Sequence, residues 1–111
     1  MEKPYNSSHL LVNETFIVDH DVNDRWLQWF TENYLAALFR TENVKNIVFS
    51  RIVEEYNPDG NSYAIQFQTE SKYVGHIYDS TELKELRNEM YSEFRGYIAS
   101  FETKMEILKT D

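Results

Sequence analysis

The sequence predicts an α+β domain with the element order β-α-β-β-α-β, a ferredoxin-like fold with a four-stranded antiparallel sheet and two helices on one face. Apolar residues recur at helical spacing in two segments and alternate at strand spacing in four others. A strong turn signal joins two of the strands. At 111 residues the chain is long enough for one domain with one core. We expect that domain at residues 10–111, after a flexible N-terminus at residues 1–9.

The first half of the chain predicts a strand at residues 10–19 and a long helix at residues 21–40. On the strand, Glu14 interrupts an apolar face, so it lies at a sheet edge or reaches a partner. The helix has its N-cap at Asp21 or Asn23. The core-facing stripe of the helix comprises Trp26, Leu27, Phe30, Tyr34, Ala37 and Leu38.

Two large residues of this helix, Leu35 and Phe39, point away from the stripe. They indicate a second contact surface or a helix end that lies under a loop. A hairpin follows, with strands at residues 47–56 and 62–68 and a turn at residues 57–60.

A short amphipathic piece at residues 73–78 leads to a second helix, which begins with capping-box spacing at Asp79 and Glu82. Its apolar stripe comprises Leu83, Leu86, Met90, Phe94 and Tyr97. Its charged, solvated face comprises Glu82, Lys84, Glu85, Arg87, Glu89, Glu93 and Arg95. Gly96 has the position of a C-cap glycine. The fourth strand is expected at residues 98–108, with one polar face.

Two helices cover only one face of such a sheet, so the other face is wet or is covered by a partner. That second face would carry residues such as Asn13, Thr15, Gln66, Gln68, Arg51 or Ser50, mixed with apolar ones. Alternation alone does not decide which face is which. A half-polar second face suits a solvent face, or a sheet-to-sheet dimer that encloses a wet cavity.

Composition excludes several classes of function. The absence of cysteine removes disulfides, thiolate nucleophiles and cysteine metal sites. With 11 basic and 19 acidic residues, the net charge is −8, which argues against nucleic acid and an anionic membrane surface as partners. Three scattered glycines form no phosphate-binding loop. Without an apolar signal region or membrane span, a cytoplasmic protein is the default expectation.

Four stretches, residues 12–19, 24–30, 50–55 and 94–103, resemble a family of short, uncharacterised bacterial proteins of unknown function. That family is similar in fold to the dimeric α/β-barrel (ferredoxin-like) superfamily. The resemblance implies a homodimer in which two sheets face each other. Superfamily relatives include cofactor-independent monooxygenases, haem-degrading monooxygenases and small isomerases, a link at the level of fold.

The resemblance also suggests catalytic candidates. Haem-degrading relatives use a histidine on the second helix and an asparagine on the first strand, and His76 and Asn13 could fill these roles. The tryptophan that such enzymes place on the third strand is missing here, and Phe67 is the nearest aromatic residue. His9 and His20 are most simply surface residues. We expect no metal site, because three scattered histidines give no ligand spacing and residues 19–24 lack the glycine of a calcium loop.

The many aromatic residues, with eight tyrosines and seven phenylalanines, fit a core with a dimer interface, or else a cavity for a small apolar ligand. The ligand-binding candidates are Asn13, Trp26, Trp29, Arg51, Tyr63 and Phe67. A buried Arg51 would need a carboxylate partner, and Glu14 on a neighbouring strand is the candidate, within the chain or across the dimer.

These observations favour a homodimeric small-ligand-binding or interaction module without a cofactor. The alternative is a cofactorless or haem-dependent monooxygenase-like enzyme that uses the cavity together with Asn13 and His76.

Overall fold

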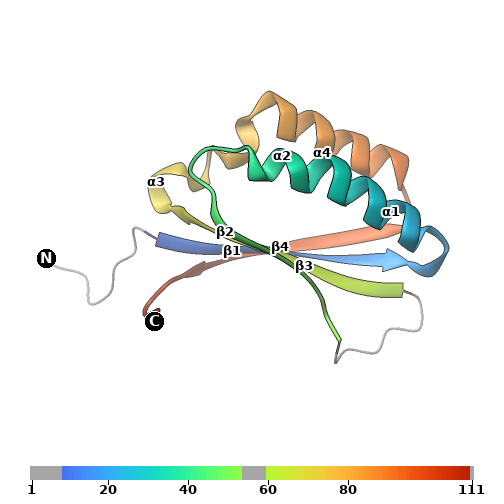
Figure 1. Ribbon diagram of the computed structural model, residues 1–111, viewed down its shortest axis with the longest axis horizontal. Coiled ribbons are helices and arrows are strands. Elements are labelled where there is room, and N and C mark those ends of the chain that lie inside the picture. The colour runs from blue at the N-terminus through green and yellow to red at the C-terminus, as the bar shows by residue number, and fades with distance from the viewer. Residues whose placement is uncertain (1–8, 54–59, 111) are drawn as a thin grey trace, which may run out of the picture.

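The computed structural model of the chain describes residues 9–53 and 60–110. It confirms the predicted α+β fold: four strands form one antiparallel sheet in the order β2-β3-β1-β4, and the helices lie over one face of it (Figure 1). The strands are β1 (His9–Asp19), β2 (Lys45–Arg51), β3 (Gly60–Glu70) and β4 (Ile98–Glu106). The helices are α1 (Asn23–Trp29), α2 (Ala36–Phe39), α3 (Ser71–Val74) and α4 (Thr81–Glu93).

Some predictions fall outside the described residues. One is the prediction of a flexible N-terminus at residues 1–9, of which only His9 is described, at the start of β1. The other is the predicted turn at residues 57–60, of which only Gly60 is described, at the start of β3. The second strand was expected to reach residue 56, but β2 ends at Arg51, and Ile52 and Val53 follow it outside the strand.

The long helix predicted at residues 21–40 is present but is not one regular α-helix. A 3-10 turn at His20–Val22 precedes α1, and a π-helical stretch at Phe30–Leu35 joins α1 to α2. The N-cap prediction was wrong, because the carboxylate of Asp19 accepts the hydrogen bond from the backbone N–H of Asp21 at 2.8 Å. Asp19 ends β1, so the same residue closes the strand and starts the helical segment.

The core-facing stripe of this helix is confirmed, and it is packed against the sheet by aromatic rings. Trp26 lies with its ring centroid 4.7 Å from that of Phe30 and 5.3 Å from those of Phe16 and Tyr63. The buried core also contains Val12, Val18, Val22, Tyr34, Ala37, Leu38, Ile65, Phe67, Ile77, Leu83, Met90 and Phe94. Rings at these separations fill the space between α1 and the sheet.

The second helix, α4, begins at Thr81 as expected, but its capping box does not form. Ser80 is the N-cap residue and its side chain makes no capping bond, while Asp79 pairs with His76 and Glu82 pairs with Arg40. The chain leaves α4 through Gly96, whose φ of 83° lies in the left-handed region that favours glycine. This turn leads directly into β4, which lies antiparallel to β1.

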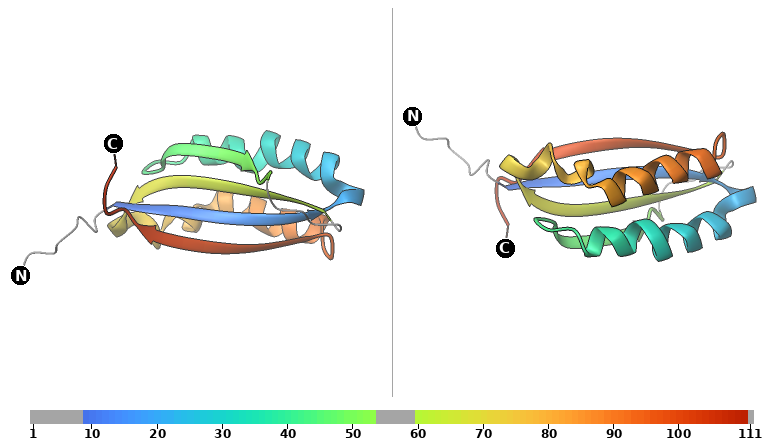
Figure 2. Two further views of the ribbon diagram at one scale, coloured as in Figure 1. Left: turned by 90° about the horizontal axis from the view of Figure 1, so that it is seen from below. Right: turned by 90° about the horizontal axis from the view of Figure 1, so that it is seen from above.

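The helices leave the opposite face of the sheet uncovered, as the view from below shows (Figure 2). Buried Val12, Glu14, Phe16 and Val18 point toward the helices, so the alternate residues of β1 point to the uncovered side. We call this uncovered side the open face. It comprises Leu11, Asn13, Thr15 and Ile17 of β1, Val48 and Ser50 of β2, Ser62, Ala64, Gln66 and Gln68 of β3, and Ala99, Phe101, Thr103 and Met105 of β4.

Candidate functional site

The open face is uncharged, although the chain is rich in charged residues. Between the strand ends, none of the described residues on this side of the sheet is Asp, Glu, Lys or Arg. Charges lie at its rim, where Asp19 ends β1, Glu70 ends β3 and Lys45 begins β2. An uncharged centre within a charged rim is the composition of a protein interface.

In β4 the polar side chains point toward the helical layer and the apolar side chains point away from it, which is the reverse of what burial under helices favours. Ser100, Glu102 and Lys104 of β4 lie opposite Phe16, Glu14 and Val12 of β1, which face the helices. The apolar side of β4 therefore lies on the open face, where Phe101 is 57% exposed and Met105 37% exposed. In a monomer, burial of that apolar side beneath α4 would be favourable, so its exposure indicates a second contact surface.

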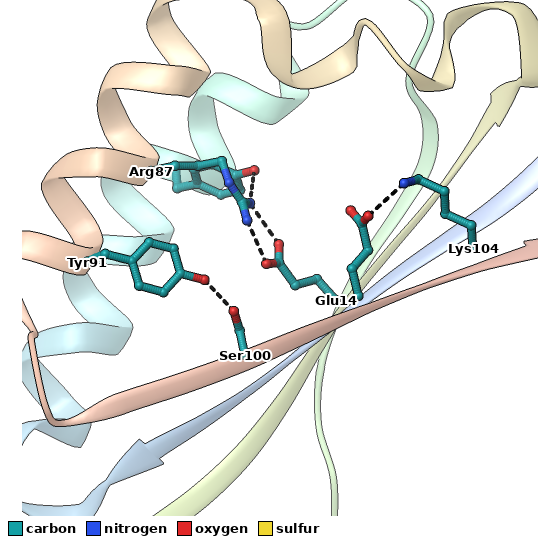
Figure 3. A network of polar contacts seen from close by, with 7 residues as sticks. Glu14, Arg87, Tyr91, Ser100 and Lys104 are labelled. Carbon is teal, nitrogen blue, oxygen red and sulfur yellow. Dashed lines mark hydrogen bonds and ion pairs between the residues drawn. The ribbon is translucent and has the colours of Figure 1, made fainter.

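A buried ion pair lies on the other side of the sheet, between α4 and β1 (Figure 3). The guanidinium of Arg87 donates two hydrogen bonds to the carboxylate of Glu14, at 2.9 and 2.8 Å. Glu14 is only 3% exposed, so its charge depends on this bidentate pair for compensation. Arg87 also donates to the phenol oxygen of Tyr34 at 3.0 Å and lies 4.6 Å from the ring centroid of Tyr78.

This environment shifts the pKa values of its members. Burial raises the pKa of the Tyr34 phenol to about 12, although the charge of Arg87 opposes the shift. Burial also raises the pKa of Tyr78 well above its ordinary value, and the neighbouring Tyr34 and Glu14 add to the shift. For Arg87, burial alone would lower the pKa, but the hydrogen bonds and charge of Glu14, with Tyr34, raise it instead. The cluster thus holds one neutralised ion pair among un-ionised phenols.

Two further contacts extend the polar cluster toward β4. The hydroxyl groups of Tyr91 on α4 and Ser100 on β4 form a hydrogen bond, and Lys104 pairs with Glu102 at 2.9 Å (Figure 3). Glu102 and Lys104 belong to the polar face predicted for the fourth strand, and both are exposed, with Glu102 directly opposite Glu14 on the helix-facing side of the sheet. Each of these two neighbouring carboxylates has its own cation, which offsets their mutual repulsion.

The π-helical stretch supplies Tyr34 to this cluster. In a π-helical turn the backbone hydrogen bonds join residues five apart, whereas in an α-helix they join residues four apart. In this stretch the side-chain amide of Asn33 also donates a hydrogen bond to the backbone carbonyl of Trp29, at 3.0 Å. Short π segments within α-helices occur frequently at functional sites. Here the segment carries Phe30 and Tyr34, both buried, toward the sheet.

The predicted partner of Glu14 was therefore wrong. Glu14 pairs with Arg87 of its own chain, whereas Arg51 is exposed and lies 5.7 Å from the ring of Tyr63. The charge pattern of the second helix predicts Arg87 on its solvated face, although Arg87 follows buried Leu83 by four residues. Two charged residues that each interrupt an apolar face, Glu14 and Arg87, were the signal that could have identified the pair.

The structure places most of the aromatic ligand-binding candidates in the core. Trp26, Tyr63 and Phe67 are buried, and Trp29 packs edge-on against Phe94 at a centroid distance of 6.1 Å. The indole N–H of Trp26 is buried and has no hydrogen-bond partner among the residues that the structure describes. The sixth candidate, Asn13, lies apart from this core on the open face, where its amide donates to the hydroxyl of Thr15 at 3.0 Å.

His76 and Asn13 are not brought together within the chain. His76 lies in the helical layer, exposed beside a surface cleft of about 440 Å³ and 3.1 Å from the carboxylate of Asp79. Asn13 points to the other side of the sheet. Because a haem held by both residues needs them at one site, the described residues of a single chain do not fit haem. Within the same residues, no cluster of three or more His, Asp or Glu side chains is placed to hold a metal ion.

The family comparison covers almost the whole chain. The family described as "Domain of unknown function (DUF4286)" matches residues 9–108. Among curated proteins, no sequence matches. No helix in the described ranges is long and apolar enough to cross a membrane.

Solved structures share the fold at low sequence identity. A Nitrosomonas europaea protein provisionally described as an antibiotic biosynthesis monooxygenase has a TM-score of 0.71 at 8% identity, with 94% of each chain covered. SnoaB from Streptomyces nogalater, a cofactor-independent oxygenase, has a TM-score of 0.67 at 12% identity, with 93% of this chain and 96% of that chain covered. A Bacteroides thetaiotaomicron protein of unknown function has a TM-score of 0.68 at 10% identity, with 91% and 99% covered. These likenesses confirm the predicted fold.

Proposed function

This chain belongs to the family described as Domain of unknown function (DUF4286), and we propose that it works as a homodimeric module that holds a small ligand between two facing sheets. The inverted polarity of β4 carries the proposal. Its apolar residues Phe101 and Met105 lie on the open face, while its charged residues Glu102 and Lys104 point to the side of the sheet that carries the helices, where both are exposed at the sheet edge. Such a strand is stable when something apolar covers its outer side.

A second copy of the chain is the occupant that the charges favour. Each copy carries a net charge of −8, so two copies repel unless they meet where charge is absent. The open face meets that condition, because its charged residues lie at the rim. An isologous contact pairs the same patch on both copies, which suits an uncharged surface, whereas a basic partner would gain nothing from it.

The ligand part of the proposal follows from where space is left. Between the helices and the sheet, rings of Trp26, Phe30 and Tyr63 already fill the interior. The open face instead carries polar side chains such as Asn13 and Gln66 among its apolar residues. Two such faces do not form one continuous apolar contact, and the proposed small molecule lies between them, where it bonds to these polar groups.

Light scattering on the purified protein tests the dimer. We expect twice the 13.3 kDa mass of one chain at micromolar concentration. Phe101→Glu places a charge among the exposed apolar residues of β4 on the open face of each copy, and is expected to give monomers.

The matched control is Phe39→Glu. Phe39 is 64% exposed at the end of α2, outside the open face, so this variant should stay dimeric. A monomeric wild-type protein, or a Phe101→Glu variant that stays dimeric, contradicts the proposed interface. Circular dichroism of both variants checks that each is folded.

The alternative function is a monooxygenase-like enzyme. It is favoured by the fold shared with SnoaB, which is described as a cofactor-independent oxygenase, and this is an analogy of fold. A haemin titration separates the haem version from the binding module. A Soret shift that disappears in His76→Ala would support the haem-dependent enzyme, whereas we expect no shift that depends on His76.

A further inference from the structure

We infer that the middle of the two paired open faces binds a small uncharged ligand with both a hydrogen-bond donor and an acceptor. This inference rests on the homodimer proposed above. It concerns a row of polar side chains that runs across the sheet at the level of Asn13.

The row is formed by three neighbouring strands. Asn13 of β1 lies opposite Gln66 of β3 on one side and opposite Thr103 of β4 on the other. Along β1, Leu11 precedes the row on the open face, and Thr15 and then Ile17 follow it. The polar groups therefore lie inside the open face, where a second copy would remove them from water.

Among the described residues of one chain, the hydrogen bonds of the row are incomplete. The Asn13 amide donates to the Thr15 hydroxyl at 3.0 Å, which leaves the Asn13 carbonyl oxygen and a second N–H without use. The side chain of Gln66 forms no hydrogen bond with other residues in the ranges 9–53 and 60–110. A carboxamide that is buried without partners destabilises an interface, so either the second copy or a ligand must supply them.

The chemistry of the face selects the ligand. A charged ligand would be buried without a counter-ion, because the charges lie at the rim. A purely apolar ligand would leave the carboxamides of Asn13 and Gln66 unpaired. A small ring that carries a carboxamide satisfies both requirements, since it donates and accepts hydrogen bonds at one end and contacts Leu11 or Met105, the next pair along the strands, with the other.

Three probes of one size test this inference: benzamide, which is neutral and polar, benzoate, which is charged, and toluene, which is apolar. On the ¹⁵N-labelled dimer, benzamide is expected to shift the side-chain NH₂ signals of Asn13 and Gln66, and neither other probe should do so. In Gln66→Leu, benzamide affinity is expected to fall roughly tenfold, the size of one hydrogen bond. The same substitution should tighten the dimer, because it replaces an unpaired amide with an apolar side chain.

The outcomes separate this inference from the proposed dimer. If light scattering shows a monomer, the proposed function itself fails. If the protein is dimeric but benzamide binds no better than benzoate and toluene, the ligand site is wrong. If Gln66→Leu weakens the dimer, the carboxamides pair with their counterparts in the second copy, and the inference is overturned.

Discussion

At the scale of single residues, the pair of Glu14 and Arg87 joins α4 to the sheet. Glu14 is buried at 3% exposure, and both of its oxygens accept bonds from Arg87. A buried pair of this kind adds little compared with apolar residues of the same shape, but the loss of one partner leaves an uncompensated charge. The pair therefore joins α4 to β1 at a point where the loss of one partner costs more than the loss of both.

We expect Arg87→Met to lower the free energy of unfolding by about 3–5 kcal/mol, because it leaves the Glu14 charge buried alone. Urea denaturation measures this change. The double variant Glu14→Leu with Arg87→Met should recover most of the loss, since it removes both charges.

Arg25→Met is the control for this prediction. Arg25 pairs with Glu93 at 3.2 Å, but both side chains are more than half exposed, so its loss should cost no more than about 1 kcal/mol. Equal effects of Arg87→Met and Arg25→Met would show that the Glu14 pair is no more important than a surface pair.

At the scale of elements, the π-helical stretch and β4 depart from regular behaviour. The stretch at Phe30–Leu35 interrupts the helix that the sequence predicts as regular, and it brings Tyr34 to Arg87. β4 exposes its apolar side because that side belongs to the open face. The π-helical stretch thus contributes Tyr34 to the polar cluster under α4, and the exposed apolar side of β4 contributes to the interface of the proposed dimer.

The amide of Asn33 is expected to stabilise the π stretch. Asn33→Ala removes its bond to the Trp29 carbonyl and should cost about 1 kcal/mol of unfolding free energy. Hydrogen exchange should become faster at the amides of residues 33–37.

Gln28→Ala is the matched control on α1. The bond from Gln28 to Glu32, at 3.3 Å, joins two exposed side chains, so this variant should change stability by no more than about 0.5 kcal/mol. If both variants leave exchange in the π stretch unchanged, Asn33 does not hold it.

At the scale of the whole molecule, net charge governs the proposed assembly. Two copies with a charge of −8 each repel over a distance that salt shortens, from about 30 Å at 0.01 M to about 8 Å at 0.15 M ionic strength. The proposed interface has few ion pairs to lose, because its centre is uncharged.

We therefore expect the dimer to tighten when sodium chloride is raised from about 0.01 M to about 0.15 M. Sedimentation equilibrium at several protein concentrations measures the dissociation constant. An interface held by salt bridges would weaken over the same range, so a dissociation constant that rises with salt contradicts the proposed interface. The Phe101→Glu variant should remain monomeric at the lower sodium chloride concentration, about 0.01 M.

The sequence by itself determined the order of the elements and their core stripes. Trp26, Phe30, Tyr34 and Leu38 are buried as the helical spacing predicts, because side-chain direction follows from local backbone geometry. Composition likewise determined the acidic charge and the absence of thiol chemistry.

Tertiary structure alone decided which side of each strand meets the helices. Alternation shows that Ser100 and Glu102 lie on a side different from that of Phe101, but not which side is buried. The partner of Glu14 was decided in the same way, because Arg87 lies far away in the sequence and only the placement of α4 over β1 brings the two together. Local periodicity specifies directions within an element, whereas contacts between elements depend on how those elements pack.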